Sequence, residues 1–369
     1  MRSDHGGNLR ALGEAGGLSS DSILDFSANI NPLGLPPRVA QAIRDAIPSI
    51  THYPDPEALC LRRALAAYHR LDAEQILPGC GSTELIYLIA RALQPKRALV
   101  LAPAFSEYEV SLGGVGTYVE QLVLDEEAGF LPDLSSLVKR LPGCDFLVLA
   151  NPNNPAGSLI RLDALTEILQ ASERHGATLV LDEAFIDFVE ESSAKRLLSA
   201  FPNLLILRSL TKFFALPGLR VGYLLGSPGL LKPLLRFKEP WSVNVLGEAA
   251  ALAALEDHEY QERSVTLVRQ WRQELSDQLS EFPSLKVFPT CANYLLVKLL
   301  TPNLDAPTLR AWLLKEGIAI RDCSSFTGLG PSFFRIAVRR PEENRRVGAA
   351  LKAVFGVRDS GLGVRSLDS

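Results

Sequence analysis

Short apolar runs in the middle of the chain constrain its fold more than any other feature. They are too short for buried helices, and they are continuous rather than alternating in polarity, as in strands covered on both faces. Segments of helical character, such as 83–93 and 162–174, separate most of them. The pattern predicts a mainly parallel sheet of an α/β protein. The runs are 98–102, 146–150, 178–182, 204–208 and 220–225.

The last of these runs should enter the sheet in the opposite direction. Only 11 residues lie between 208 and 220, and they include Pro217 and Gly218. A parallel crossover usually needs about a dozen or more residues that contain a helix. We therefore expect 220–225 to be one antiparallel strand in an otherwise parallel sheet.

The pattern changes after about residue 247 and indicates a second, smaller α+β domain. A long helical stretch at 247–281 precedes strands at 293–298 and 333–338, with a helix near 307–316 between them. The polar, Gly/Ser-rich C-terminus is typical of disorder. We predict an N-terminal segment that packs with the small domain (1–47), a large domain (48–256), the small domain (257–356) and a disordered tail (357–369).

Charge and composition argue against several classes of protein. The net charge of −4, with no long basic run, argues against a nucleic-acid partner. The five scattered cysteines include no C-x-x-C pair, so we expect free thiols in the reducing cytoplasm. The sequence contains no uncharged apolar stretch of about 18 residues, so we expect no membrane-spanning helix. The polar N-terminus does not resemble a signal peptide. The histidines lack metal-ligand spacing, so we expect no metal.

Polar residues gather where three of the predicted strands end. Asn151–Gly157 follows one strand, Asp182–Asp187 begins at the end of the next, and Ser209–Phe214 follows a third. Ligands of open α/β sheets bind beyond the carboxyl ends of the strands. Three clusters at one edge are hard to explain as turns alone, so we expect a site there.

Lys212 is the candidate for covalent chemistry. It stands between a polar turn and an apolar run, where desolvation lowers a lysine pKa, and a neutral amine can form a Schiff base with an aldehyde. Asp182 could keep a pyridine nitrogen protonated, and Asn154 could donate to a phenolic oxygen. Taken alone, each has an ordinary interpretation: a solvated loop lysine, a capping carboxylate and a turn former.

Several residues could bind anions. Ser82 and Thr83 open a helix after a Gly-Cys-Gly turn, and helix N-termini favour phosphate. A simple helix cap explains these two residues equally well. Ser209 and Arg220 could add a hydroxyl and a guanidinium. Glu84 occupies the place of the third glycine of a dinucleotide fingerprint and argues against that motif.

Two arginines of the predicted small domain, Arg321 and Arg335, are candidate clamps for a carboxylate or a phosphate. Either could instead be an ordinary surface residue.

Three motifs together resemble the fold type I pyridoxal phosphate enzymes of the aminotransferase class. They are Asn151-Pro-Asn-Asn-Pro-Ala-Gly157, Asp182-Glu-Ala-Phe185 and the stretch from Ser209 to Tyr223, SLTKFFALPGLRVGY. The branch it resembles most contains histidinol-phosphate aminotransferases and threonine-phosphate decarboxylases. The decarboxylases are favoured by His5-Gly-Gly-Asn8, Asp25–Gly34, Trp241–Asn244 and Phe334–Arg339. The resemblance covers about residues 5–355.

The resemblance implies a role for each candidate residue. Lys212 carries pyridoxal 5'-phosphate, Asp182 pairs with its pyridine nitrogen and Asn154 with its phenolic oxygen. Phe105 stacks on the ring, with Tyr108 as the weaker choice. The cofactor phosphate is held by Ser82, Thr83, Ser209, Arg220 and, from the partner subunit of a homodimer, Tyr53. The substrate contacts are His5, Gly6, Asn29, Asn154, Arg321 and Arg335, of which Arg335 is the usual carboxylate-binding arginine.

One departure from the aminotransferase pattern bears on the reaction. Aminotransferases of this group usually have tyrosine where this chain has Phe185, and its hydroxyl helps to tune the cofactor. The resemblance therefore implies decarboxylation of L-threonine O-3-phosphate to (R)-1-amino-2-propanol O-2-phosphate and carbon dioxide in cobalamin biosynthesis. Histidinol-phosphate aminotransferase is the alternative.

Two other classes are less well supported. Ser209-Leu-Thr-Lys212 matches the S-x-x-K motif of serine acyl-transfer enzymes, but their S-D-N and K-T-G motifs are absent from the sequence. A cofactor-free regulator built on this fold would also match the strand pattern, although every cofactor-binding position looks intact.

Overall fold

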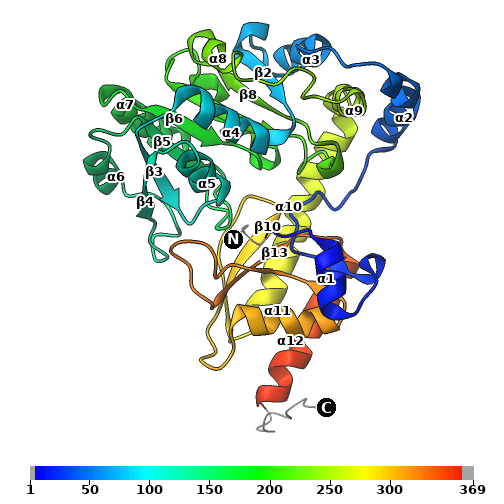
Figure 1. Ribbon diagram of the computed structural model, residues 1–369. Helices are drawn as coiled ribbons and strands as arrows, with labels where there is room; N and C mark the ends of the chain where they lie inside the picture. Colours follow the sequence, from blue (N-terminus) through cyan, green and yellow to red (C-terminus); the bar gives the residue numbers. More distant parts are fainter. Residues whose placement is uncertain (1–4, 360–369) are drawn as a thin grey trace.

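A seven-stranded sheet forms the centre of the protein. The computed structural model describes residues 5–359, and 1–4 and 360–369 lie outside the described residues. The strand order is β2-β8-β7-β6-β5-β3-β4 (Figure 1). The strands are β2 (Ile76–Gly79), β3 (Arg97–Ala102), β4 (Tyr118–Val123), β5 (Phe146–Ala150), β6 (Thr178–Asp182), β7 (Leu204–Ser209) and β8 (Gly222–Gly226).

The predicted direction of the last strand is confirmed. β8 pairs antiparallel with both β7 and β2, whereas the pairs from β7 through β6, β5 and β3 to β4 are parallel. The sequence did not reveal β2 or β4. β4 is an edge strand whose side chains are all partly or fully exposed, so it leaves no continuous apolar run. β2 is short and contains Pro78.

Helices cover both faces of this sheet, which explains why its strands are apolar on both sides. Alternate residues of one strand enter different cores: Val180 of β6 packs with α4, α5 and α8, and Leu179 and Leu181 pack with α3, α6, α7 and α9. These helices are α3 (Leu59–His69), α4 (Gly81–Leu93), α5 (Glu107–Gly113), α6 (Leu134–Arg140), α7 (Leu162–Arg174), α8 (Pro228–Leu234) and α9 (Val245–Leu255).

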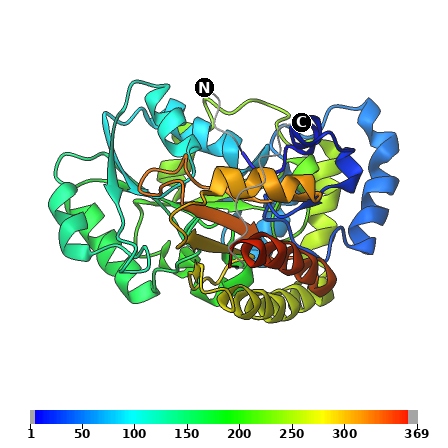
Figure 2. The same ribbon diagram turned by 90° about the horizontal axis from the view of Figure 1, so that it is seen from below.

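A four-stranded antiparallel sheet, with strand order β12-β13-β10-β9, lies below the large sheet in Figure 1. Helices α10 and α12 lie side by side against it (Figure 2). The expected single helical stretch at 247–281 is wrong, because the chain breaks between α9 and α10, where the Asp257 side chain caps the new helix. The elements are α10 (His258–Ser280), β9 (Leu285–Val287), β10 (Tyr294–Leu299), α11 (Ala306–Lys315), β12 (Arg321–Asp322), β13 (Phe333–Ala337) and α12 (Pro341–Asp359).

The N-terminal segment contacts both parts of the molecule. Helix α1 (Leu9–Gly16) packs on α11, and β1 (Leu24–Asp25) pairs with β11 (Ile318–Ala319) of the smaller part. Helix α2 (Pro37–Ala46) packs instead on α9. The domain boundaries therefore stay a prediction. Helix α12 ends at Asp359, inside the expected tail, and the remaining tail lies outside the described residues.

Short 3-10 helices complete the chain. They are Ser20–Ser22, Ile47–Thr51, Ala73–Gln75, Ile186–Ser192, Ala194–Leu197 and Pro217–Leu219. Within residues 5–359, no helix is both long enough and apolar enough to cross a membrane.

Gly222 on β8 allows the sheet to approach the N-terminus of α4 closely. A Cβ at this position would lie 2.5 Å from the Ser82 nitrogen and 2.9 Å from the Arg208 carbonyl oxygen. We predict that Gly222→Ala lowers the free energy of unfolding by about 1–3 kcal/mol through overpacking. Urea denaturation would measure it. Gly218→Ala is the control, because a Cβ added at Gly218 would meet no atom within 4 Å. Equal stabilities of the two variants would contradict the prediction.

Candidate active site

A cavity of about 340 Å³ brings together residues from three parts of the chain: the N-terminal segment, the loops after the large sheet's strands, and the small domain. All but two of the predicted site residues line it. The lining residues among them are His5, Gly6, Asn29, Ser82, Thr83, Phe105, Asn154, Asp182, Lys212, Arg220, Arg321 and Arg335. The loops that follow β5 and β7 supply Asn154 and Lys212, and Asp182 is the last residue of β6, as expected for a site at the carboxyl ends of parallel strands.

Lys212 meets the physical requirement for a reactive amine. Burial, helped by the positive charges of Arg335 and Arg220, lowers the pKa of Lys212 from 10.5 to about 8, and the Asp182 carboxylate opposes this shift. The Lys212 Nζ also lies 6.0 Å from the ring centre of Phe185, which has no hydroxyl to solvate it. A substantial fraction of this amine is therefore neutral near pH 7 to 8.

Asp182 is fixed in orientation by two donors. The Tyr108 hydroxyl donates to its Oδ2 at 2.6 Å, and the Ala184 nitrogen donates to its Oδ1 at 2.9 Å. Burial raises the pKa of Asp182, while these two hydrogen bonds and the charge of Lys212 lower it. Tyr108, considered from the sequence only as a stacking ring, thus contacts the carboxylate through its hydroxyl.

The N-terminus of α4 forms an anion site with Arg220. Gly81 has a φ of +77°, and a Cβ there would lie 2.8 Å from Arg220 Nη2, so only glycine leaves room for the guanidinium. Arg220 Nη1 donates to the Pro217 carbonyl oxygen at 3.1 Å. With Ser82 and Thr83 on the cavity wall, the helix dipole, two hydroxyls and a cation favour the same bound anion.

Arg335 on β13 joins the three parts of the site. Its Nη1 donates to Asn154 Oδ1, and its Nη2 donates to the Ser27 carbonyl oxygen at 2.9 Å. Its guanidinium lies 5.3 Å from the ring centre of Tyr294. Nearby, Arg321 Nη2 donates to Ser325 Oγ at 3.3 Å. These contacts hold two cationic side chains on the small-domain wall of the cavity.

The N-terminal residues close one side of the cavity. His5 Nε2 lies 2.8 Å from Glu107 Oε1, and the His5 ring packs on Phe105 at 5.3 Å. A Cβ on Gly6 would lie 2.2 Å from the Ser27 carbonyl oxygen, so glycine is required for this approach. Asn29 Oδ1 is buried and has no hydrogen-bond partner within residues 5–359. A ligand donor could satisfy it.

Two predicted residues do not line this cavity in the described chain. Ser209 is buried, and its Oγ lies 2.8 Å from Thr211 Oγ1. Tyr53 is 82% exposed and packs on Trp241. Their roles stay predictions. The sequence did not single out the lining residues Ser27, Thr211, Ser325 and Phe326; the first two lie inside motifs quoted above, and the last two lie in no motif.

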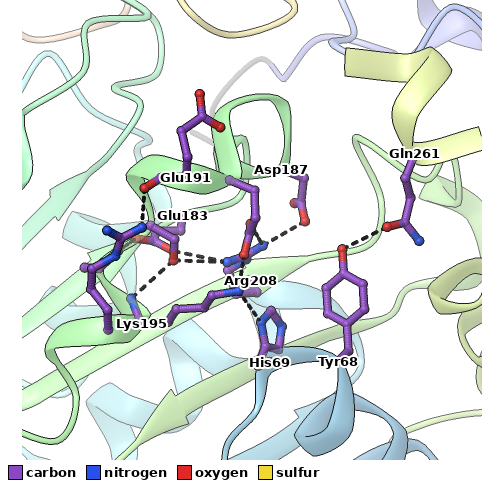
Figure 3. Close-up of polar contacts among 12 residues, drawn as sticks. Tyr68, His69, Glu183, Asp187, Glu191, Lys195, Arg208 and Gln261 are labelled. Carbon is purple, nitrogen blue, oxygen red and sulfur yellow. Dashed lines mark hydrogen bonds and ion pairs between the residues drawn. The ribbon is translucent and has the colours of Figure 1, made fainter. Parts of the chain in front are cut away.

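Behind the site, on the opposite face of the sheet, lies a buried charge cluster (Figure 3). Side chains alternate along β7, so Arg208 points to the other face of the sheet from its neighbours Leu207 and Ser209, and Glu183, which directly follows β6, points toward Arg208. Arg208 is fully buried and donates to Glu183 at 3.3 Å, to Asp187 at 2.8 Å and to Glu190 at 2.5 Å. Burial raises the pKa of Glu183 to about 7.

The model of the family "Aminotransferase class I and II" matches residues 21–351. This chain belongs to that family. A threonine-phosphate decarboxylase of Salmonella typhimurium is 39% identical over 96% of this chain and 97% of that protein. A histidinol-phosphate aminotransferase of Methanothermobacter thermautotrophicus is 33% identical over 92% of this chain and 91% of its own.

The fold of this aminotransferase family is also found among solved structures. Histidinol-phosphate aminotransferase from Sinorhizobium meliloti, in complex with pyridoxal-5'-phosphate, has a TM-score of 0.84 and 25% identity, with 95% of each chain covered. The cavity of the present family member fits that cofactor. It offers an amine (Lys212), a buried carboxylate (Asp182), an aromatic wall (Phe105) and the anion site at α4.

The lowered pKa of Lys212 predicts a measurable stability effect in the cofactor-free protein. Below pH 8 the folded state bears the cost of a buried ammonium, and this cost fades as the pH rises from about 8 to 10.5. We expect Lys212→Met to raise the free energy of unfolding at pH 7 by at most about 3 kcal/mol, and by less to the extent that the cavity admits water. The gain should disappear near pH 10.5.

Denaturant unfolding across this pH range would measure the effect. Lys195→Met is the matched control, because Lys195 is paired with Glu190 at 2.6 Å and its loss should bring no gain. If Lys212→Met is no more stable than the wild type at pH 7, the buried-ammonium interpretation is wrong.

Proposed function

We propose that this protein decarboxylates L-threonine O-3-phosphate with pyridoxal 5'-phosphate as cofactor. The products are (R)-1-amino-2-propanol O-2-phosphate, a precursor in cobalamin biosynthesis, and carbon dioxide. The observation that carries the proposal is the placement of Lys212 in one cavity with a buried carboxylate on one side and two arginines on the other. The 39% identity to a threonine-phosphate decarboxylase supports the choice of substrate.

Each part of the cavity has a role in this proposal. Lys212 would hold the cofactor covalently, Asp182 would hold its pyridine nitrogen, and Ser82, Thr83 and Arg220 would hold its phosphate. When bound, pyridoxal phosphate supplies an electron sink for the electrons of the bond that breaks at Cα. Phe105 and Phe185 give the cavity apolar walls that exclude water from the reacting atoms.

The arginines decide which bond is aligned for cleavage. Arg335 is held by Asn154, Ser27 and the Tyr294 ring, so it offers a fixed cation to the substrate carboxylate. Arg321 and His5 also line the cavity and would bind the remote phosphate. Binding energy from a remote anion can fix the orientation of the reacting group. Loss of carbon dioxide then requires that the carboxylate, and not the Cα hydrogen, be held in the reactive direction.

Lys212 can supply a proton in this reaction, as it could in amino transfer, and Phe185 favours decarboxylation over amino transfer. With a pKa of about 8, the Lys212 amine can hold a proton and return it to Cα after carbon dioxide has left. Phe185 packs edge-on against Tyr294 at 5.0 Å and presents no hydroxyl to the cofactor. Aminotransferases of this group usually have tyrosine at this position, and its absence supports the decarboxylase.

Product analysis tests the proposed reaction. We expect the purified protein to release carbon dioxide from L-threonine O-3-phosphate and to form aminopropanol phosphate in equal amount. Arg335→Gln should reduce kcat/KM by about 100-fold, because a misplaced carboxylate loses its alignment. Histidinol phosphate with 2-oxoglutarate is the competing substrate pair. The aminotransferase alternative would be established if histidinol phosphate and 2-oxoglutarate gave a keto product while L-threonine O-3-phosphate released no carbon dioxide.

The proposed enzyme acts as a homodimer with shared sites. Tyr53 is 82% exposed, and its ring packs at 4.8 Å on Trp241, itself 48% exposed. Ile50, three residues earlier, is also exposed. An exposed group of this kind suits burial by a second copy of the chain, which would bring Tyr53 to the partner's cofactor phosphate. The cytoplasmic location stays a prediction.

Subunit mixing tests this arrangement. Lys212→Ala and Tyr53→Phe each remove one contribution to a site, so we expect both single variants to be impaired. After subunit exchange, some mixed dimers should regain one intact site and up to about a quarter of the wild-type activity, if the subunits mix at random. Sedimentation at assay concentration should show a dimer. A monomer, or no recovery despite proven exchange, would exclude shared sites.

A further inference from the structure

Asn31 is a buried residue of the N-terminal segment to which the proposed function assigns no role. It lies in the Asn-Pro-Leu-Gly turn between β1 and α2 and is only 2% exposed. The stretch just before it, residues 27–29, lines the cavity. A buried asparagine must satisfy both its donors and its acceptor, so its partners show what the residue holds in place.

The partners of Asn31 are centred on the cofactor lysine. Its backbone nitrogen donates to the Lys212 carbonyl oxygen at 3.0 Å, and its Nδ2 donates to the Phe213 carbonyl oxygen at 2.7 Å. The same Nδ2 lies 2.8 Å from Ser264 Oγ on α10, and Oδ1 accepts from the Leu33 nitrogen at 3.0 Å. One residue thus holds two consecutive carbonyl groups of the lysine loop.

The lysine loop needs such a partner because it has left the sheet. Strand β7 ends at Ser209, and the Leu210 nitrogen still reaches the Val221 carbonyl oxygen at 3.1 Å. Residues 210–214 then form turns, and the Lys212 carbonyl receives only a 3.3 Å bond from Ala215 within the loop. The two bonds from Asn31 are the shortest external hydrogen bonds of this loop's backbone, and substitution of the side chain removes the one to Phe213 while the backbone bond to Lys212 remains possible.

We propose that Asn31 is a positioning residue for Lys212 that couples the substrate-contacting stretch 27–29 to the lysine loop. The contact of residues 27–29 with the substrate rests on the proposed function. The anchoring of the lysine loop by Asn31 does not. A shift of residues 27–29 toward a bound substrate is transmitted through the rigid turn to the backbone of Lys212. Asn31, through its side chain and its backbone, therefore sets the position of the Lys212 amine relative to the substrate.

Two substitutions separate the contacts of Asn31. Asn31→Ala removes both the side-chain donors and the acceptor. Asn31→Asp keeps the acceptor for the Leu33 nitrogen and loses the donors to the Phe213 carbonyl and Ser264. The matched control is Asn344→Ala, since Asn344 is 3% exposed and makes two comparable bonds, both with Arg339, far from the lysine loop in sequence.

The first readout needs no cofactor. In the cofactor-free protein, we expect both Asn31 variants to speed amide hydrogen exchange at residues 210–216 by about tenfold or more, as a local opening becomes easier. Asn344→Ala should leave exchange in this peptide unchanged, even if its overall stability falls equally. Wild-type exchange at 210–216 in Asn31→Asp would overturn the proposal.

The second readout is kinetic. In the cofactor-loaded enzyme, both Asn31 variants should lower kcat for L-threonine O-3-phosphate by about 100-fold, as expected for a misplaced reactive group. KM should change much less, and Asn344→Ala should keep the wild-type kcat per folded molecule. An equal loss of kcat in Asn344→Ala would show a merely structural effect and overturn the proposal.

A second variant covers the possibility that the Asn31 variants do not fold. The Tyr260 hydroxyl lies 3.2 Å from the Phe213 carbonyl oxygen of the lysine loop and 3.0 Å from the Gly34 carbonyl oxygen of the Asn31 turn, and its single proton can be donated to either. Tyr260→Phe should speed exchange at 210–216, and unchanged exchange in that variant would then overturn the proposal. Failure of the proposed function is recognised separately: the wild type would release no carbon dioxide, while the exchange data would still decide the role of Asn31 in anchoring the loop.

Discussion

The buried ion cluster around Arg208 is the interaction on which the active site depends. Glu183 directly follows Asp182 and Arg208 lies four residues before Lys212, and the ion pair between Glu183 and Arg208 joins the ends of β6 and β7. Removing one partner of a buried ion pair leaves an uncompensated charge and typically costs about 3–5 kcal/mol. The cluster therefore helps to hold the ends of β6 and β7 in register. The positions of Asp182 and Lys212, which lie at and after these strand ends, depend on that register.

The charges of this cluster are nearly balanced. Three carboxylates, those of Glu183, Asp187 and Glu190, face Arg208 and Lys195. His69 adds no charge, because burial holds its pKa well below the usual value, and its Nε2 lies 2.7 Å from the Tyr223 hydroxyl. Burial, with a smaller contribution from the charge of Glu190, raises the pKa of Glu183 to about 7.

The sequence predicted the parts of the fold and site that rest on local pattern. β5, β6 and α7 have the expected bounds because buried strands and an amphipathic helix leave clear periodicities, and Asp182 and Lys212 were found because they follow such strands. Edge strand β4 was missed, since its side chains are exposed. The roles of Tyr108, Asn31 and Arg208 could not be predicted, because each depends on a partner tens to hundreds of residues away in the chain.

Because β8 pairs antiparallel with β7, the two strands form one hairpin with the connecting residues 210–221. Lys212 stands near its start and Arg220 near its end, and the pairing of Ser209 with Gly222 closes it. Lys212, the proposed covalent anchor of the cofactor, and Arg220, a proposed phosphate anchor, are thus a fixed number of residues apart on one closed loop. An insertion or deletion there would change the span between the two anchors. The cavity walls formed by His5, Gly6, Arg321, Ser325 and Phe326 come from segments outside this loop, so a change of side chain there leaves the span between the two anchors unaltered.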